Sequence, residues 1–224
     1  MFIIRGEIMS KKILIPIIVV ILVILIILAV FFYKKDEHKN ENTQNMNEIE
    51  EKEETSMYSK GKHHAQITIK NYGVISLELD ADSAPITVAN FAKLVNTGFY
   101  DGLTFHRIID GFMIQGGDPL GTGMGGSDEE IKGEFLANGV KNTISHERGV
   151  ISMARAKSYN SASSQFFIMQ KDTPYLDGSY AAFGHVTEGI EIVDKICEDT
   201  QVEDDNGTVL KENQPIIEKI IMID

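Results

Sequence analysis

The sequence of 224 residues has one cysteine, Cys197, and fewer basic than acidic side chains. A single cysteine excludes an internal disulfide and a zinc-finger cluster. Lysine and arginine number 21 against 33 acidic residues, which gives a formal net charge of -12. Nucleic-acid-binding proteins normally carry a basic patch, so we expect no nucleic-acid partner. Cys197 lies on the apolar face of a predicted helix, IEIVDKICED, and we expect it to be a core residue.

The sequence also lacks the common motifs of nucleotide, metal and nucleophilic chemistry. It contains no P-loop, no GxSxG nucleophile turn and no HExxH metal motif. The segment GTGMGG, residues 121–126, formally matches a dinucleotide-binding pattern, but it follows GDPL and precedes the acidic SDEE. Acidic side chains there would repel a pyrophosphate, and the six histidines show no metal-ligand spacing. We therefore expect no cofactor and no metal.

One long uncharged run stands out near the N-terminus. Residues 13–33 carry no charged side chain, and roughly 20 apolar residues span a bilayer core. The run is longer than the apolar core of a cleaved signal peptide, and no small-x-small site follows it. We expect a single-pass anchor in the cell membrane, with residues 1–12 cytoplasmic and the folded domain extracytoplasmic. Basic residues flank the run almost equally, so the positive-inside rule gives nearly a tie. We expect the extracytoplasmic side because a single N-terminal span ahead of a folded domain most often leaves the domain outside. Met9 is an alternative start.

Residues 34–63 are rich in glutamate, asparagine and lysine and have almost no apolar side chains. A segment of this composition cannot bury enough surface to fold, so we expect a disordered linker. The alternative is a short solvated helix around NEIEEKEE.

Residues 64–224 form the third zone, with short apolar runs separated by glycine-rich turns. AQITIK and GVISLELD alternate in polarity around a turn near Gly73, which predicts a hairpin. APITVANFAKLVNTG has Pro85 near its start, an apolar stripe and Gly98 as a stop, which predicts a helix. EGIEIVDKICE predicts a second helix. The pattern as a whole indicates a mainly β domain, a closed antiparallel barrel with helical plugs.

The segment FHRIIDGFMIQGGD predicts another hairpin, with an arginine in one arm and a glutamine in the other. A two-residue turn would pair Ile109 with Phe112 and place Arg107 and Gln115 on opposite faces. A three-residue loop instead pairs Ile109 with Met113 and puts Arg107 opposite Gln115. We favour the three-residue loop because its register separates the apolar core face from the polar face far better, and a slip of one residue would turn every side chain to the other face.

In the favoured register Ile108 and Ile114 enter the core, while Arg107, Met113 and Gln115 share the outer face. Buried polar side chains need partners. From the hairpin alone, a pair that only braces the sheet and an arginine that awaits a ligand are equally consistent with the sequence.

The hairpin segment, together with GTGMGG, SMARAK, SSQFFI and YLDGSYAAFGHV, resembles the cyclophilin-type peptidyl-prolyl cis–trans isomerases. The resemblance runs in order from Ala65 to the end of the sequence. It implies an eight-stranded antiparallel barrel capped by two helices. It also implies an enzyme that needs no cofactor and acts on the X–Pro bonds of proline-containing polypeptides. We expect the domain to be monomeric.

The resemblance also implies the roles of individual residues. Arg107 falls on the catalytic arginine and Gln115 on the glutamine that braces it. The remaining matches are substrate-binding positions. The proline pocket falls on Phe112, Met113, Phe167 and Leu176, the groove before the proline falls on Ala154 and Gln165, and Tyr175 and Tyr180 also belong to this group.

Three positions depart from the family pattern. Tyr175 replaces a frequent tryptophan that supports cyclosporin binding, which puts sensitivity to that drug in doubt. Tyr180 replaces a common histidine, but its hydroxyl can still donate a hydrogen bond. Arg155 replaces an asparagine at a position that mostly offers its backbone, so we expect little effect there.

The sequence therefore predicts a membrane-tethered isomerase that accelerates folding of extracytoplasmic clients at X–Pro bonds. This reaction breaks no bond and needs no nucleophile, which agrees with the motifs that the chain lacks. The alternative is a membrane-tethered module that binds proline segments, or acts as a chaperone, with little turnover.

Overall fold

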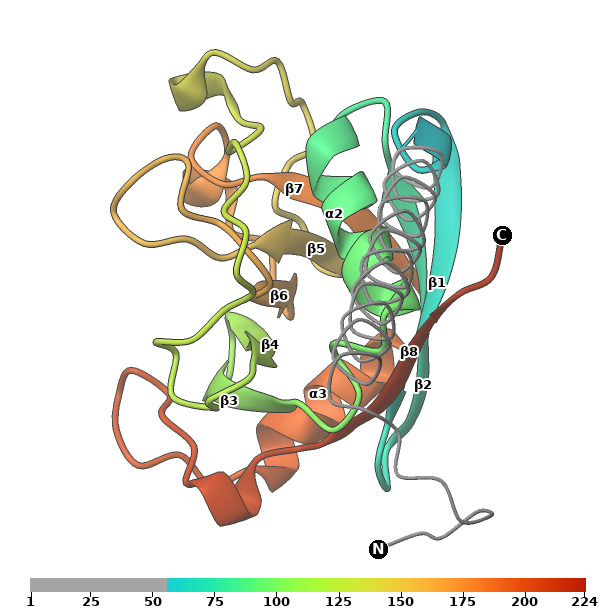
Figure 1. The fold of residues 1–224 in the computed structure, drawn as a ribbon. Helices are drawn as coiled ribbons and strands as arrows, with labels where there is room; N and C mark the ends of the chain where they lie inside the picture. Colours follow the sequence, from blue (N-terminus) through green and yellow to red (C-terminus); the bar gives the residue numbers. More distant parts are fainter. Residues whose placement is uncertain (1–55) are drawn as a thin grey trace, which may run out of the picture. The chain divides into compact units, whose positions relative to one another are not determined.

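The computed structural model describes residues 56–224 (Figure 1). Within them lie eight strands, two α-helices and three short 3-10 helices. The strands are β1 (Lys62–Ile69), β2 (Gly73–Asp80), β3 (Thr104–Ile109), β4 (Met113–Asp118), β5 (Val150–Met153), β6 (Phe166–Met169), β7 (Ala182–Glu188) and β8 (Ile217–Met222). The helices are α2 (Pro85–Asn96), α3 (Ile190–Asp199), η1 (Leu136–Asn138), η2 (Pro174–Leu176) and η3 (Lys211–Asn213). The domain is mainly β, as predicted.

The eight strands form one antiparallel sheet in the order β3-β4-β6-β5-β7-β2-β1-β8. The predicted first hairpin is confirmed, because β1 pairs with β2 with Ile67 opposite Ile75. Its turn contains Asn71 in the left-handed backbone region, at a φ of 68°, which asparagine tolerates better than most residues. Alternate residues of both strands point into the core, as the period of two requires.

The expectation of a closed barrel is corrected to a half-barrel. The end strands β3 and β8 touch through the Thr104–Ile216 bridge and a few adjoining backbone hydrogen bonds. Farther along, residues 207–209 occupy the free edge of β3, and Ile108 N donates to Gly207 O over 2.8 Å. A strand edge offers one row of donors and acceptors, so β8 cannot continue along an edge that is already paired.

The two predicted helices are confirmed. Helix α2 begins with Pro85 in its first turn, where the missing N–H has no intrahelical partner to lose. It is followed by Gly98 at a φ of 70°. Its buried stripe includes the predicted apolar residues Val88, Phe91, Ala92 and Val95. In Figure 1, α2 (green) lies toward the top and α3 (orange) toward the bottom.

Helix α3 places Cys197 as the sequence predicted. Its thiol lies among the buried residues of the core, and burial raises the pKa of Cys197 to about 12. A thiol at this pKa stays protonated at neutral pH and is a poor nucleophile. Cys197 is therefore a packing residue.

An aromatic cluster fills the core under the strands that carry the hairpin. The Phe91 ring lies 5.3 Å from Tyr100, 5.8 Å from Phe166 and 5.4 Å from Phe183, measured between ring centroids. All four side chains are fully buried, and each such burial stabilises the fold by about 1.5–3 kcal/mol. This packing gives β3, β4 and β6 a rigid base.

The predicted membrane span (residues 13–33), the cytoplasmic segment before it and most of the predicted linker lie outside the described residues. Within residues 56–224 no helix is long and apolar enough to cross a membrane. The described part of the predicted linker packs on the domain, because Tyr58 is only 5% exposed. Its hydroxyl donates to the backbone oxygen of Asp224 over 3.0 Å. The folded domain therefore starts several residues before residue 64.

We predict that Tyr58 stabilises the domain although it lies in a hydrophilic stretch. Tyr58→Ala should lower the free energy of unfolding by about 3 kcal/mol, because a buried ring is removed. Tyr58→Phe keeps the ring and should lose only about 1 kcal/mol, the contribution of one hydrogen bond. Urea unfolding of the two variants tests this, and equal losses would contradict it.

His106 has an unusual environment on β3. The pairing of β3 with β4 shifts register between Phe105 and Arg107, so His106 occupies a β-bulge. The ring is 5% exposed, and neither of its nitrogens has a partner among the described residues. Burial lowers the pKa of His106, although the carboxylate of Asp118 opposes the shift.

The lowered pKa predicts a loss of stability in acid. Below the ordinary histidine pKa of about 6.5, the unfolded chain binds a proton at this position that the folded chain does not. Stability should therefore fall by up to about 1.4 kcal/mol per pH unit for this side chain. His106→Phe should flatten the dependence between pH 7.5 and pH 5.5 in urea unfolding. Identical slopes in parent and His106→Phe would refute the assignment.

Candidate active site

The β3–β4 hairpin has the predicted three-residue loop. Ile109 lies opposite Met113, and Arg107 lies opposite Gln115. Gly111 adopts a φ of 79° in the loop, which is the left-handed position that such loops require. The backbone N–H of Gly111 also donates to the side-chain oxygen of Gln170. The loop therefore fixes both the register and the direction of the Arg107 side chain.

A cavity of about 330 Å³ opens beside this hairpin. Every predicted site residue except Gln165 lines it, and Arg155 lines it as well. The complete lining is Arg107, Phe112, Met113, Gln115, Ala154, Arg155, Phe167, Tyr175, Leu176 and Tyr180. The cavity thus brings together residues from β3, β4, β6 and η2, from the segment that follows β5 and from the segment that precedes β7, across more than seventy positions of sequence.

The inner part of the cavity is apolar and well supported. Met113, Phe167 and Leu176 are buried in a second hydrophobic cluster, separate from the main core. Phe112 stacks on Tyr175 with ring centroids 6.3 Å apart and an interplanar angle of 25°. Tyr175 itself is 76% exposed, so this pair forms the rim of the cavity.

Arg107 stands at the polar side of the cavity and forms no ion pair with a carboxylate among residues 56–224. Its Nη1 donates to Gln115 Oε1 over 3.2 Å. Its Nε donates to the backbone oxygen of Asn206 over 2.8 Å, and its Nη2 donates to Asn206 Oδ1 over 3.3 Å. Burial lowers the pKa of Arg107, yet arginine remains protonated in proteins. Three of the five N–H groups are engaged, and two remain for a ligand.

Gln165 completes the support of this arginine from outside the cavity. Gln115 Nε2 donates to Gln165 Oε1 over 2.9 Å. Gln165 Nε2 in turn donates to the backbone oxygens of Gly125, over 2.7 Å, and Gly123, over 3.1 Å. These contacts orient the Gln115 amide so that its oxygen faces Arg107. Gln165 also lines the neighbouring groove, together with Ala154.

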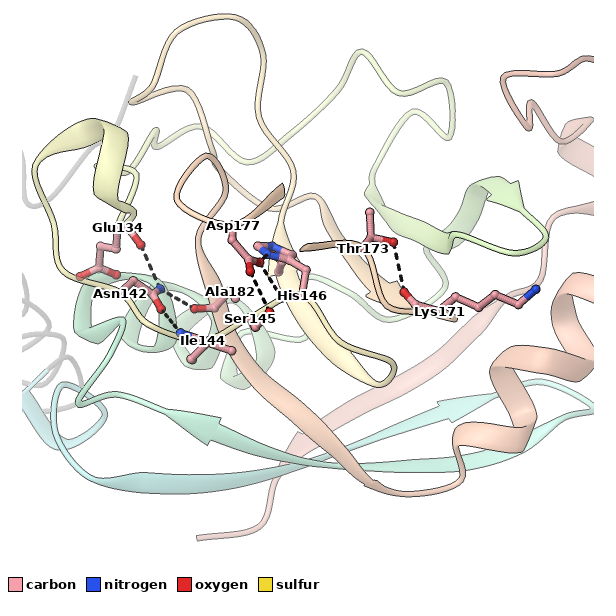
Figure 2. Close-up of polar contacts among 10 residues, drawn as sticks. Glu134, Asn142, Ile144, Ser145, His146, Lys171, Thr173, Asp177 and Ala182 are labelled. Atoms are coloured by element: carbon pink, nitrogen blue, oxygen red, sulfur yellow. Dashed lines mark hydrogen bonds and ion pairs between the residues drawn. The ribbon is translucent and has the colours of Figure 1, made fainter. Parts of the chain in front are cut away.

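A polar chain of Ser145, Asp177 and His146, of which only His146 is fully buried, supports η2 and Phe167 (Figure 2). His146 Nδ1 lies 2.8 Å from Asp177 Oδ1, and Ser145 Oγ donates to Asp177 Oδ2 over 2.7 Å. Asp177 directly follows η2, which supplies two residues of the cavity. Burial alone would raise the pKa of Asp177, but the hydrogen bonds from His146 and Ser145 together lower it. The carboxylate therefore stays charged and holds η2 in place.

The same histidine also contacts the cavity wall. The His146 ring stacks on Phe167 with centroids 6.1 Å apart and an angle of 18°. Its Nε2 lies 3.0 Å from Ser152 Oγ. Asp177, His146 and Ser152 resemble a hydrolytic triad in composition, but Ser152 is fully buried and cannot meet a substrate. The chain is a support for Phe167.

Two residues of the site escaped the sequence analysis. Asn206 lies 99 positions from Arg107, and only the pairing of residues 207–209 with β3 brings it there. The sequence signal there is a polar turn, EDDNGT. It predicts a loop, but it does not predict that this loop lies beside β3. Arg155 was expected to matter little, but it lines the cavity.

Comparisons with known proteins agree with this geometry. The family model described as cyclophilin type peptidyl-prolyl cis-trans isomerase/CLD matches residues 64–221. The chain is 47% identical over 138 residues to peptidyl-prolyl cis-trans isomerase B of Bacillus subtilis, covering 62% of this chain and 87% of that protein. It is 47% identical over 142 residues to a peptidyl-prolyl cis-trans isomerase of Helicobacter pylori, covering 62% of this chain and 84% of that protein.

A solved structure is similar over nearly its whole length. The cyclophilin type isomerase of Cryptosporidium parvum superposes with a TM-score of 0.64 at 32% identity, covering 73% of this chain and 99% of that chain. A second structure of that protein, in the presence of the dipeptide Ala-Pro, gives a TM-score of 0.63. Similarity of sequence and of fold therefore extends over the whole of the segment that carries the cavity, and the chain belongs to the cyclophilin-type peptidyl-prolyl cis–trans isomerases.

Proposed function

We propose that this isomerase turns X–Pro bonds in the cavity beside Arg107, in client polypeptides outside the membrane that anchors it. The observation that carries the catalytic part is the state of Arg107. It is a charged guanidinium at the wall of an apolar cavity, held by the uncharged Gln115 and Asn206, with two N–H groups left over.

The chemistry needs such a cation. Rotation about a peptide bond faces a barrier of about 18–20 kcal/mol because resonance gives the bond partial double-bond character. In the twisted transition state that resonance is lost, and a lone pair localises on the prolyl nitrogen. A guanidinium N–H directed at this nitrogen stabilises the lone pair more than it stabilises the planar ground state, and only such differential stabilisation accelerates a reaction.

The apolar wall supports the same step in two ways. Phe112, Met113, Phe167 and Leu176 offer a surface for the proline ring, which holds the ring while the preceding carbonyl rotates. Water excluded from the cavity no longer competes for the arginine, which strengthens the electrostatic interaction. Uncharged partners matter here, because a carboxylate beside Arg107 would offset its charge.

Proline-containing polypeptides are the substrate class that this arrangement fits. The similar enzyme of Cryptosporidium parvum was solved in the presence of the dipeptide Ala-Pro. Ala154 and Gln165 line the groove that adjoins the cavity, so the residues before the proline would lie along it. Binding without turnover is the alternative, and a kinetic measurement separates the two.

The extracytoplasmic location is supported by the sequence. Residues 13–33 have the length and lack of charge of a membrane span, and a hydrophilic segment follows them up to the start of the domain near Tyr58. A tethered isomerase in this place would meet chains as they emerge from translocation, before their proline bonds have equilibrated over tens of seconds.

Arg107→Ala should slow isomerisation by about 10²–10³-fold, the effect of losing one electrostatic donor to a transition state. Peptide affinity should fall much less because the apolar cavity remains. Arg107→Lys should restore little, because an ammonium lacks the planar fork that contacts Gln115 and Asn206 together. Exchange spectroscopy on a proline tetrapeptide gives the rate, and titration of the same peptide gives the affinity.

A matched control is Arg148→Ala. Arg148 forms a two-bond pair with Asp194, with Nη2 to Oδ2 at 2.6 Å, and it does not line the cavity. This variant should keep the isomerisation rate. Equal losses of rate and affinity in Arg107→Ala would refute the transition-state role, and a parent protein that binds without turnover would favour the binding module.

The location predicts that protease added to intact cells degrades the domain. A cytoplasmic marker protein should survive in the same cells, and deletion of residues 13–33 should release the protein from the membrane fraction. A domain that is protected until the cells are lysed would place it on the cytoplasmic side instead.

A further inference from the structure

Arg155 has an environment unlike that of an ordinary surface arginine. Among residues 56–224 it takes part in no ion pair. Its guanidinium carbon instead lies 5.2 Å from the ring centroid of Phe135, 5.1 Å from that of Tyr159 and 4.7 Å from that of Tyr180. Rings within about 6 Å attract a cation through their electron-rich faces. Three rings thus take the place of an acidic partner.

The donors of Arg155 hold the backbone next to Tyr180. Nε and Nη2 both donate to the backbone oxygen of Ser179, over 3.0 and 2.9 Å. Nη1 donates to the backbone oxygen of Ala156 over 3.0 Å. The guanidinium therefore fixes the peptide before Tyr180 and also contacts the Tyr180 ring. With these donors engaged inside the chain, Arg155 is not arranged to read an acidic substrate.

Tyr180 presents its other side to the cavity. It lines the cavity together with Arg107, and its ring meets Phe167 edge-on, with centroids 5.9 Å apart at 84°. Within the described residues no hydrogen bond is found for the Tyr180 hydroxyl. A phenol that lines a binding cavity without a hydrogen-bond partner is available to donate to a carbonyl oxygen of the bound peptide.

We propose that Arg155 is a positioning residue for the isomerisation, and that it acts through Tyr180. The guanidinium fixes the Tyr180 backbone and ring, so that the hydroxyl meets the carbonyl oxygen before the proline in its rotated position. The positive charge over the ring also draws electron density away from the phenol, which makes its O–H a stronger donor. The inference rests on the proposed function, because it needs the peptide to turn over in this cavity.

The test is a double-substitution cycle with Arg155→Met and Tyr180→Phe in the full chain. Arg155→Met removes the charge and the donors but keeps a long apolar side chain, and Tyr180→Phe removes the hydroxyl alone. Each should slow isomerisation of a proline tetrapeptide by about 3- to 30-fold, the span that cation–π energies correspond to. The dissociation constant should change little. The double variant should be no slower than the slower single variant, because residues that act as one unit are not additive.

A spectroscopic readout separates positioning from turnover. With ¹³C-labelled tyrosine, the Tyr180 ring signal is the one that disappears in Tyr180→Phe. Arg155→Met should shift this signal in the peptide-free protein. If Arg155→Met does not fold, Arg155→Gln, which keeps a donor for the Ser179 oxygen, takes its place and must give the same non-additive result.

Lys195→Met is the matched control. The Lys195 ammonium lies 5.9 Å from the Tyr72 ring centroid, and neither residue lines the cavity, so this variant loses a cation–π contact without touching the site. Its rate should equal that of the parent. Additive losses in the double variant, or an unchanged rate in Arg155→Met, would overturn the inference while the enzyme remains an isomerase. Absence of catalysis in the parent would instead overturn the proposed function.

Discussion

The site depends on one constraint, a charged guanidinium that forms no ion pair within residues 56–224. Removing a cation from water is costly unless hydrogen bonds replace the lost solvation. For Arg107 these bonds come from Gln115 on the neighbouring strand and from Asn206 on a distant loop. Each partner needs its own support. Gln165 orients Gln115, and the pairing of residues 207–209 with β3 holds Asn206. The half-barrel has the same cause. The loop that carries Asn206 pairs with the free edge of β3, and β8 would need that edge to close the barrel.

The apolar side of the cavity shows a parallel arrangement. Phe167 lies between the His146 ring and the Tyr180 ring, and each of these neighbours has further contacts of its own. His146 is fixed by Asp177 and Ser152, and Tyr180 is contacted by Arg155. If the apolar wall were soft, the proline ring could rotate together with the preceding carbonyl. The X–Pro peptide bond would then not be twisted. Polar contacts thus support both sides of the cavity.

The local sequence pattern was sufficient to predict those structural features that depend on residues close together in the sequence. The alternation of apolar side chains fixed the β3–β4 register, and with it the pairing of Arg107 with Gln115. Proline and glycine marked the ends of α2. The contacts that were not foreseen all join distant segments. Asn206 reaches Arg107 across 99 positions, and Tyr58 reaches Asp224 across 166. Tyr58 also lies in a stretch whose average composition is polar and indicates disorder. Such an average does not reveal a single aromatic side chain that packs on the domain.

The amide partners of Arg107 have a consequence for the setting in which the enzyme works. Glutamine and asparagine side chains exchange no proton in the physiological range, and arginine keeps its own. The groups that contact the guanidinium therefore present the same charge in acidic and in neutral surroundings. In the location that we propose, outside the membrane, the surroundings are less buffered than the cytoplasm. Catalysis by such a cluster is insensitive to the acidity of the surroundings for as long as the fold itself survives.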